Sequence, residues 1–233
     1  MDTVMDTLLH TTHGAALPLH CRGRRDYAGE FAAMRHYTRA RGGDDEDQLW
    51  LLEHWPVYTL GRRAAPVAGG AIPVVHTDRA TASARRRQVA GNAIPVVHTD
   101  RGGQATYHGP GQAVLYTLLD LKRRGLGVRC YVGLLEEAVI AFLGGCGVRA
   151  RRLPGAPGVY VEGRKIASLG LSVFNGRCYH GVALNVCMDL SPFAGIVACG
   201  QRGVEATQLA DCGVAMDVES AGAGVARNLA VRL

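Results

Sequence analysis

The stretch that most constrains this chain is Asp100–Gln112, which reads DRGGQATYHGPGQ. It holds four glycines and one proline, and it lies between two apolar segments, 94–97 and 113–121, that predict strands. Glycine lets the backbone approach a ligand because no Cβ stands in the way, and successive amides there can form a nest for an oxyanion. The pattern therefore predicts a binding loop. A long hairpin loop without a function is the alternative that composition alone leaves open.

Length and composition indicate one globular domain. The chain has 233 residues, of which 48% are hydrophobic, enough to bury a core of its own. No apolar run approaches the roughly 20 residues of a membrane span, and the N-terminus lacks the basic and apolar regions of a signal peptide. The seven cysteines are scattered without a CxxC pair, which is typical of reduced thiols in the cytoplasm. We therefore expect a cytoplasmic protein without a disulfide framework or a metal site.

The charge is basic and is carried almost entirely by arginine. The formal net charge is +6, and the only lysines are Lys122 and Lys165. A basic surface suits nucleic acid, a membrane or an acidic protein. The arginines are dispersed and aromatic residues are few, so nucleic acid is disfavoured and an acidic protein fits at least as well. Where arginine supplies most of the charge, a lysine is a candidate for proton transfer because its amine can lose a proton.

The spacing of apolar residues predicts an α/β fold in which a central mixed sheet carries packed helices, since no regular βαβ alternation is present. Residues 1–20 are weakly patterned and are interpreted as a flexible leader to a single domain over 21–233. Helices are predicted over 27–41, 128–143 and 217–233. Strands are predicted over 48–53, 57–60 and 158–161, and a hairpin over 165–174 and 177–186 around Asn175–Gly176, a dipeptide favoured in type I′ turns.

The chain also contains an internal repeat near 67–101. Val67–Arg79 recurs as Val89–Arg101, 22 residues later, with a single difference. Two copies are too few for a solenoid, so a local duplication is the simpler interpretation. Our hypothesis is that the second copy occupies the strand position and residues near 67–88 bulge outward. Such an insertion costs little free energy, because the entropy of loop closure grows slowly with loop length. Competition of both copies for one strand position is the alternative.

Cys199 and Lys165 are the candidates for chemistry. Cys199 stands between Ala198 and Gly200, two small neighbours that leave a thiol sterically open. A free cysteine is most often a small buried hydrophobe, and a catalytic thiol needs a neighbour that stabilises its thiolate. An ammonium such as that of Lys165 lowers a nearby thiol's pKa, and its amine can relay a proton. A solvated lysine at a strand start is the alternative, and the 34 residues between the two positions do not show that they meet.

Two histidines, His108 and His180, each precede a glycine. Either one positions a substrate or simply satisfies its own hydrogen bonds, and the second role is favoured for His180. A dyad of Cys199 and His108 is a competing catalytic arrangement. Metal binding is disfavoured because the nine histidines show no ligand spacing beyond His10 and His13.

Six motifs between residues 24 and 211 occur together. They are Leu51–Gly61, Arg101–Gln112, Pro157–Val161, Lys165–Gly170, His180–Val186 and Cys199–Gly200. In order and approximate spacing this set resembles the octanoyl-[acyl carrier protein]:protein N-octanoyltransferases of lipoate synthesis.

The resemblance implies a biotin/lipoate protein ligase-like fold and a cofactor-free acyltransferase acting in the first step of protein lipoylation. Such enzymes move octanoate from acyl carrier protein to a lysine of lipoyl domains, those of 2-oxoacid dehydrogenases and the glycine cleavage H protein. By position, Cys199 resembles the acyl-thioester nucleophile and Lys165 the residue that lowers its pKa. The implied substrate-binding residues are Arg101, Gly102, Gly103, Gln104, Ala105, Thr106, Tyr107, His108, Ser168, Leu169, Gly170, Gly181, Val182 and Ala183.

Two departures from the family pattern are present. Ala198 stands where the family usually has a proline before the cysteine, and the duplicated segment abuts the glycine-rich stretch. An ATP-dependent lipoate-protein ligase on the same fold, which needs no nucleophilic thiol, is the runner-up. An inactive paralogue that only binds carrier protein or lipoyl domains is a third possibility.

Overall fold

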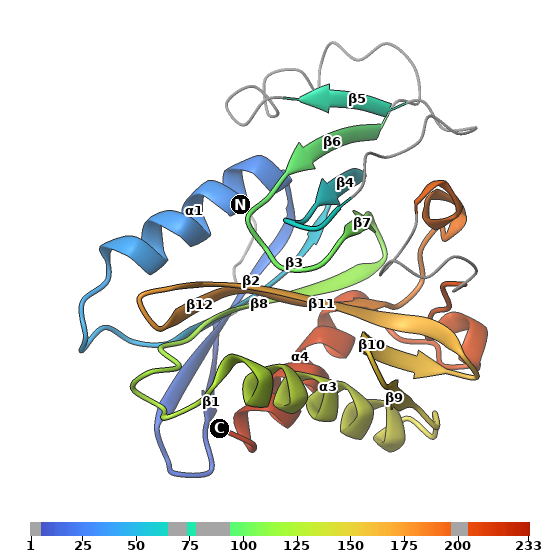
Figure 1. Ribbon diagram of the computed structural model, residues 1–233. Coiled ribbons are helices and arrows are strands. Elements are labelled where there is room, and N and C mark those ends of the chain that lie inside the picture. Colours follow the sequence, from blue (N-terminus) through green and yellow to red (C-terminus); the bar gives the residue numbers. More distant parts are fainter. Residues whose placement is uncertain (1–5, 65–73, 78–93, 197–204) are drawn as a thin grey trace.

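The computed structural model describes residues 6–64, 74–77, 94–196 and 205–233, and within these ranges the strands form two sheets (Figure 1). The larger has the order β1-β2-β3-β8-β12-β11-β10-β9 and is antiparallel except for the β2–β3 pair. Its strands are β1 (Asp6–His10), β2 (Ala16–Arg25), β3 (Gln48–His54), β8 (Gln112–Leu118), β9 (Arg151–Leu153), β10 (Ala156–Val161), β11 (Arg164–Phe174) and β12 (Arg177–Asn185). This confirms the predicted mixed sheet.

The smaller sheet has the order β5-β6-β4-β7 and stands above the larger one in Figure 1. Its strands are β4 (Val57–Leu60), β5 (Val74–Thr77), β6 (Ile94–His98) and β7 (Ala105–His108). Only β7 runs antiparallel to its neighbour. The sequence indicated some of these strands but not their separation into a second sheet.

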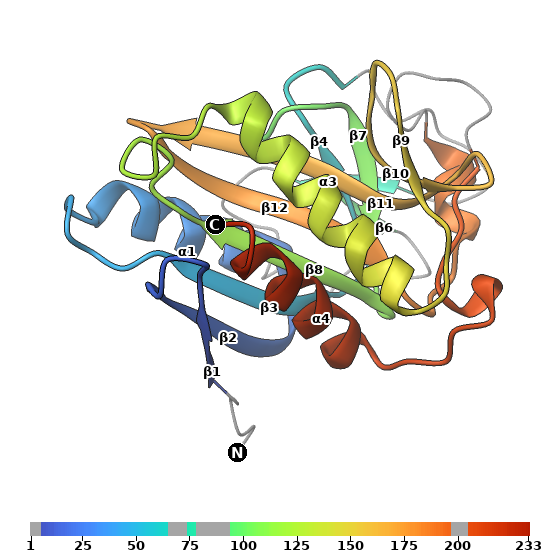
Figure 2. The same cartoon turned by 90° about the horizontal axis from the view of Figure 1, so that it is seen from below.

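Helices cover both faces of the large sheet (Figures 1 and 2). α1 (Tyr27–Ala40) lies on one face, and α3 (Val128–Gly145) and α4 (Val218–Ala230) lie on the other. Strand β8 shows why both faces are apolar: Leu115 packs in the core with α3 and α4, whereas its neighbour Tyr116 packs with α1, as the two-residue period of a strand requires. No described helix is long and apolar enough to cross a membrane.

The described part of the expected flexible leader is instead a pair of strands. β1 pairs with β2, and β2 pairs in parallel with β3 at the edge of the large sheet. Leu9, Leu17 and Leu19 are at most 8% exposed and join the core beneath α4. The expectation of a flexible leader was wrong for residues 6–20, because these leucines alternate over too few residues to stand out from the polar residues around them.

The stretch Asp100–Gln112 is not a simple hairpin loop. Its middle part forms β7, which pairs with β4, so the strands on either side of it belong to different sheets. Gly111 closes the stretch with φ +87°, and a Cβ there would lie 1.9 Å from the carbonyl oxygen of Cys187. Only glycine fits this approach. The stretch therefore joins the two sheets at a fixed distance.

Both copies of the repeat contribute a strand to the small sheet. The second copy forms β6, which lies between β4 and β5, and the first copy forms the edge strand β5. Val74 pairs with Ile94 and Thr77 with Val97. The second copy thus holds the inner position as hypothesised, but residues 74–77 do not bulge outward. Residues 65–73 and 78–93 lie outside the described part of the chain.

The predicted hairpin is confirmed as β11–β12. Phe174 pairs with Arg177 across the turn, and Asn175 and Gly176 have φ values of 50° and 82°, as a type I′ turn requires. The hairpin carries two of the three predicted substrate segments side by side, because Ser168 pairs with Ala183 and Gly170 with Gly181.

A buried carboxylate ties α1 to the turn after β8. The Asp47 side chain is 2% exposed and accepts hydrogen bonds from Arg41 at 3.2 Å, Arg123 at 2.9 Å and Arg124 at 2.7 Å. The backbone amide of Asp120 donates to the same carboxylate at 2.7 Å. Removing one partner of such a buried group leaves the others without compensation.

We predict that Asp47→Ala lowers the free energy of unfolding by about 3–5 kcal/mol, because the Arg41 guanidinium keeps its burial and loses its counter-charge. Urea unfolding followed by circular dichroism measures this. Glu137→Ala is the matched control: Glu137 pairs with Arg152 at 2.9 Å, but the two side chains are 45% and 47% exposed, so we expect a loss under about 1 kcal/mol. Equal losses in the two variants would contradict the prediction.

Candidate active site

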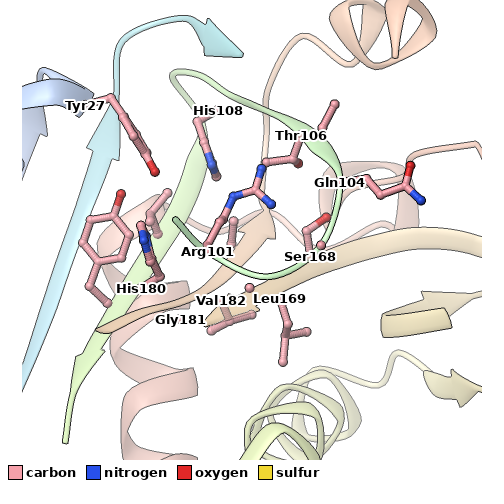
Figure 3. Close-up of a pocket in the computed structure, with 16 residues that line it drawn as sticks. Tyr27, Arg101, Gln104, Thr106, His108, Ser168, Leu169, His180, Gly181 and Val182 are labelled. Atoms are coloured by element: carbon pink, nitrogen blue, oxygen red, sulfur yellow. The ribbon is translucent and has the colours of Figure 1, made fainter. Parts of the chain in front are cut away.

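The glycine-rich stretch, the β11–β12 hairpin and the start of α1 surround one hollow (Figure 3). It encloses about 590 Å³, including space open to solvent. Its lining residues are Tyr27, Arg101, Gly103, Gln104, Ala105, Thr106, His108, Val114, Tyr116, Ser168, Leu169, Gly170, His180, Gly181, Val182 and Ala183. The structure therefore brings together three segments that are far apart in sequence.

Two of the expected substrate-binding residues do not line the hollow. Tyr107 points to the other side of β7, where its ring packs against Tyr58 and Phe193, because neighbouring residues of a strand face opposite sides. Gly102 donates its amide to the carbonyl oxygen of Leu171 at 2.8 Å. That bond anchors the stretch to β11 and occupies the amide.

Arg101 is buried at the hollow with its guanidinium tied to the small sheet. The side chain is 7% exposed and donates to the carbonyl and hydroxyl oxygens of Thr59 at 2.7 and 2.8 Å. It also donates to the carbonyl oxygen of Gly102 at 3.1 Å. These bonds fix the first turn of the stretch against β4.

Asp100 fixes the same turn to the large sheet. Its carboxylate accepts hydrogen bonds from Tyr179 at 2.6 Å and His180 at 3.2 Å, and Arg35 of α1 lies 3.5 Å away. Burial opposes ionisation, but the bonds from His180 and Tyr179 and the nearby Arg35 outweigh it, and the pKa of Asp100 falls to about 2. The carboxylate is therefore charged at neutral pH.

Two buried histidines, His108 and His180, line the hollow, and a third, His54, packs against His108 with ring centroids 5.8 Å apart. Burial lowers the pKa of His54 to about 4 and that of His108 well below its ordinary value. Burial also lowers the pKa of His180, although the hydrogen bond that His180 donates to Asp100 opposes the shift. All three imidazoles are consequently neutral at pH 7. His180 satisfies the hydrogen-bonding role favoured for it and also lines the hollow.

Lys165 does not line the hollow but lies on the strand that does. It precedes Ser168 by three residues, about 10 Å along an extended strand. The side chain is 5% exposed, and its amine donates to the carbonyl oxygen of Pro157 at 2.8 Å. Gly158 makes room for it, because a Cβ there would lie 2.4 Å from Cε of Lys165. The lysine is thus buried rather than a solvated charge at a strand start.

Cys199 lies outside the described residues, so the pairing of its thiol with Lys165 stays a prediction. The chain is described again from Glu205, whose carbonyl oxygen accepts from the backbone amide of Lys165 at 2.8 Å. Thr207 then donates its amide to the carbonyl oxygen of Lys165 at 2.9 Å. The segment that follows Cys199 by six residues is therefore fixed beside Lys165.

Four residues that line the hollow are absent from the implied substrate-binding set: Tyr27, Val114, Tyr116 and His180, of which only His180 was weighed as a candidate from the sequence. Tyr27 opens α1 and is separated from the other lining residues by more than seventy positions. Val114 and Tyr116 alternate along β8 directly after the glycine-rich stretch, and His180 stood in a recognised motif. Only these last three carried a signal in the sequence.

A family model described as the lipoyl protein ligase A/B catalytic domain matches residues 26–229. The chain belongs to this family. A curated relative from Methylococcus capsulatus is 50% identical over 214 residues, covering 91% of this chain and 93% of the relative. Another, from Alkalilimnicola ehrlichii, is 52% identical over 195 residues, covering 82% of this chain and 80% of the relative. Both are named octanoyltransferase, so the membership extends to the octanoyltransferases, which are acyltransferases.

Solved structures confirm the expected biotin/lipoate protein ligase-like fold. Lipoate-protein ligase A bound with ATP matches with a TM-score of 0.66 at 17% identity, over 90% of this chain and 82% of that chain. Biotin protein ligase from Aquifex aeolicus, in complex with biotin and ATP, matches with a TM-score of 0.51 at 11% identity, over 91% of this chain and 68% of that chain. At these identities the likeness concerns the fold.

We predict that Asp100→Asn lowers the free energy of unfolding by about 1–2 kcal/mol at pH 7. The folded-state pKa of about 2 lies below the ordinary 3.8, so the charged form stabilises the fold above pH 4, and this contribution is lost as the pH falls through 2. Denaturant unfolding of both proteins between pH 7 and pH 2.5 should show the difference shrinking. Asp44→Asn, in an exposed turn, is the control; a gap for Asp100→Asn that does not depend on pH would contradict the assignment.

Proposed function

We propose that this enzyme transfers an octanoyl group from acyl carrier protein to a lysine amine of a lipoyl domain, through a thioester on Cys199. One observation carries the proposal: the three segments implied to bind the acyl substrate line one hollow, apart from Gly102 and Tyr107. These segments are Arg101–His108, Ser168–Gly170 and Gly181–Ala183. Relatives that are about 50% identical to this chain are named octanoyltransferase, which supports octanoyl as the acyl group.

The walls of the hollow suit an acyl chain. Val114 and Ala183, which pair across β8 and β12, supply apolar side chains on the face that Tyr27 and Tyr116 also share. Burial of a methylene contributes about 0.8 kcal/mol, so a chain of eight carbons gains several kcal/mol where it is fully covered. The lining histidines are neutral, and the one cationic side chain among the described residues that line the hollow, Arg101, is bonded to Thr59. A neutral hydrocarbon therefore meets little competing charge.

In the first step the Cys199 thiolate attacks the carbonyl carbon of the octanoyl thioester. A bond to the Cys199 sulfur forms, the bond to the phosphopantetheine sulfur breaks, and Lys165 delivers a proton to the departing thiolate. In the second step the lysine amine of the lipoyl domain attacks the same carbon. The amide bond forms, the Cys199 sulfur leaves, and the proton lost by the amine returns to the Lys165 and Cys199 pair.

Backbone amides are proposed to stabilise the oxyanion in both steps. The Gly102 amide is excluded because it donates to Leu171. Gly103 and the Ser168–Gly170 segment remain as the sources, and both line the hollow. An amide nest at the glycine-rich turn needs no side chain, which agrees with the composition of the stretch.

The proposed partners are octanoyl-acyl carrier protein and the lipoyl domains of 2-oxoacid dehydrogenases and of the glycine cleavage H protein, met in the cytoplasm. The formal net charge of +6 favours encounter with acidic proteins. We expect the association rate to fall as salt concentration rises, since screening shortens the range of attraction.

We predict that Cys199→Ser forms no stable acyl adduct and that Lys165→Ala slows transfer by about 10²–10⁴-fold, the range of general acid–base catalysis. Intact-mass spectrometry after mixing with octanoyl-acyl carrier protein should show one octanoyl group on the wild-type protein and none on Cys199→Ser. Cys130→Ser, which removes an exposed thiol at the start of α3, is the matched control and should retain the adduct.

Three results would overturn the proposal. Full transfer by Cys199→Ser would rule out the thioester. A requirement for ATP with free octanoate would make the chain a ligase, like the solved structure named lipoate-protein ligase A. Capture of the carrier protein without any transfer would identify a paralogue that only binds.

A further inference from the structure

A chain of buried amide side chains leads from Lys165 into the hollow. The Lys165 carbonyl accepts from the Thr207 amide, and the Thr207 carbonyl accepts from Nδ2 of Asn185 at 2.8 Å. Oδ1 of Asn185 faces Nε2 of Gln112 at 2.9 Å, and Oε1 of Gln112 faces Nδ1 of His108 at 2.7 Å. Lys165 and Thr207 take part through their backbones, whereas Asn185, Gln112 and His108 take part through their side chains.

The direction of every hydrogen bond in this chain is fixed by its first member. A backbone carbonyl such as that of Thr207 can only accept, so Asn185 donates with its nitrogen and turns its oxygen to Gln112. Gln112 must then donate in turn and present its own oxygen to His108. A reversed amide would place two acceptors together at a buried site, which costs about 1–3 kcal/mol for each unsatisfied group. His108 is therefore the donor, and its proton is on Nδ1.

The second ring nitrogen of His108 is left with a lone pair. The imidazole is neutral and carries one proton, which is on Nδ1. Within the described ranges no group hydrogen-bonds to Nε2, and Nε2 is not one of the buried polar atoms that lack a partner. Because His108 lines the hollow, this nitrogen is reached from the hollow. Figure 3 shows the ring turned toward the space shared with Arg101.

The surroundings of His108 keep the ring neutral. Burial, then the neighbouring His54, Arg101 and His180, all disfavour the imidazolium, and the hydrogen bond to Gln112 only partly opposes them. Tyr27 of α1 stacks on the ring at 5.8 Å with an interplanar angle of 12°. The ring thus stays in place and remains an acceptor through the physiological pH range.

We propose that Nε2 of His108 accepts a hydrogen bond from an N–H group of a substrate and orients it at the reacting carbon. The inference rests on the proposed function, which supplies two sources of such a group. One is an amide of the phosphopantetheine arm that carries the acyl group, and the other is the incoming lysine amine. The octanoyl chain itself has no N–H.

The tautomer is tested first, on the unmodified protein. ¹⁵N-histidine labelling and two-dimensional NMR that correlates ring protons with both nitrogens should show a pyrrole-type Nδ1 and a pyridine-type Nε2 for His108 near pH 7. A proton on Nε2 would overturn the proposal, whether or not the protein transfers an acyl group.

The acceptor role is tested with His108→Asn, whose amide can still donate to Gln112 but has no atom at the Nε2 position. The half-reactions are followed separately by mass spectrometry, as adduct formation from octanoyl-acyl carrier protein and as loss of the adduct on addition of a lipoyl domain. A slowing of about ten- to a hundred-fold is expected in one of them. A slow first step assigns the N–H to phosphopantetheine, and a slow second step assigns it to the lysine.

His36→Gln, at an exposed position of α1, is the control, and thermal unfolding checks that His108→Asn is folded. If both half-reactions run at the wild-type rate in the variant, His108 is not the acceptor. If the wild-type protein forms no acyl-enzyme, the proposed function fails and the substrate assignment falls with it, while the NMR result still decides the tautomer.

A second variant separates this role from a structural one. Gln112→Glu places a carboxylate beside Nδ1 and favours the imidazolium, so Nε2 gains a proton and becomes a donor. The same change puts an oxygen against Oδ1 of Asn185, so thermal unfolding checks that this variant is folded. We expect its activity to fall as the pH is lowered, with a midpoint that follows the NMR titration of His108. Gln48→Glu adds the same charge on β3 and should leave the pH profile unchanged. Loss of activity in Gln112→Glu at every pH, with His108 still neutral, would contradict the role.

Discussion

The carboxylate of Asp100 is the contact on which the arrangement of the site depends. It accepts from Tyr179 and His180 of β12 and lies beside Arg35 of α1, while the next residue, Arg101, is bonded to Thr59 of β4. Two adjacent residues of opposite charge therefore hold the large sheet, the small sheet and a helix at one point. Because the carboxylate stays charged to a pH of about 2, the junction does not depend on the solution conditions that the enzyme meets. The Gly102–Gly103 turn needs no side chains of its own because the two residues before it are fixed in this way.

Much of the site could be predicted from the sequence, because its three segments carry recognisable patterns and its hairpin turn has a chemical signature in Asn175–Gly176. Only the resemblance predicted that these segments lie together, since the spacing of apolar residues does not show which strands become neighbours. Tyr107 and Gly102 show a finer limit. Both stand in the motif, yet strand alternation turns Tyr107 away, and the Gly102 amide is used by Leu171. A motif names a segment, whereas the hydrogen bonds and the pleat decide which of its atoms face the ligand.

The errors of prediction have physical causes of their own. The strands β1 and β2 are stabilised by burial of Leu9, Leu17 and Leu19 against a helix two hundred residues later, and a local window cannot contain that contact. The duplicated segment was expected to bulge outward because lengthening a surface loop costs little conformational entropy. Instead its first copy adds β5 to the edge of a parallel pair, where the backbone of β6 offers unpaired hydrogen-bonding groups. The glycine-rich stretch still follows the inner copy, so the duplication extends the small sheet on the side away from β7.

The residues that line the hollow are distinct from the residue proposed to transfer protons. The histidines that line it, His108 and His180, are held neutral by burial, and the cation of Arg101 is bonded to Thr59 of the small sheet. No described lining residue is thus placed to supply a strong base, although His108 can accept a hydrogen bond. The proton transfer of the proposed mechanism is assigned to Lys165, which lies about 10 Å along β11 from Ser168. The amide chain through Asn185 and Gln112 links the backbone of Lys165 to His108, so the residue proposed to orient the substrate and the residue proposed to move protons belong to one hydrogen-bonded unit.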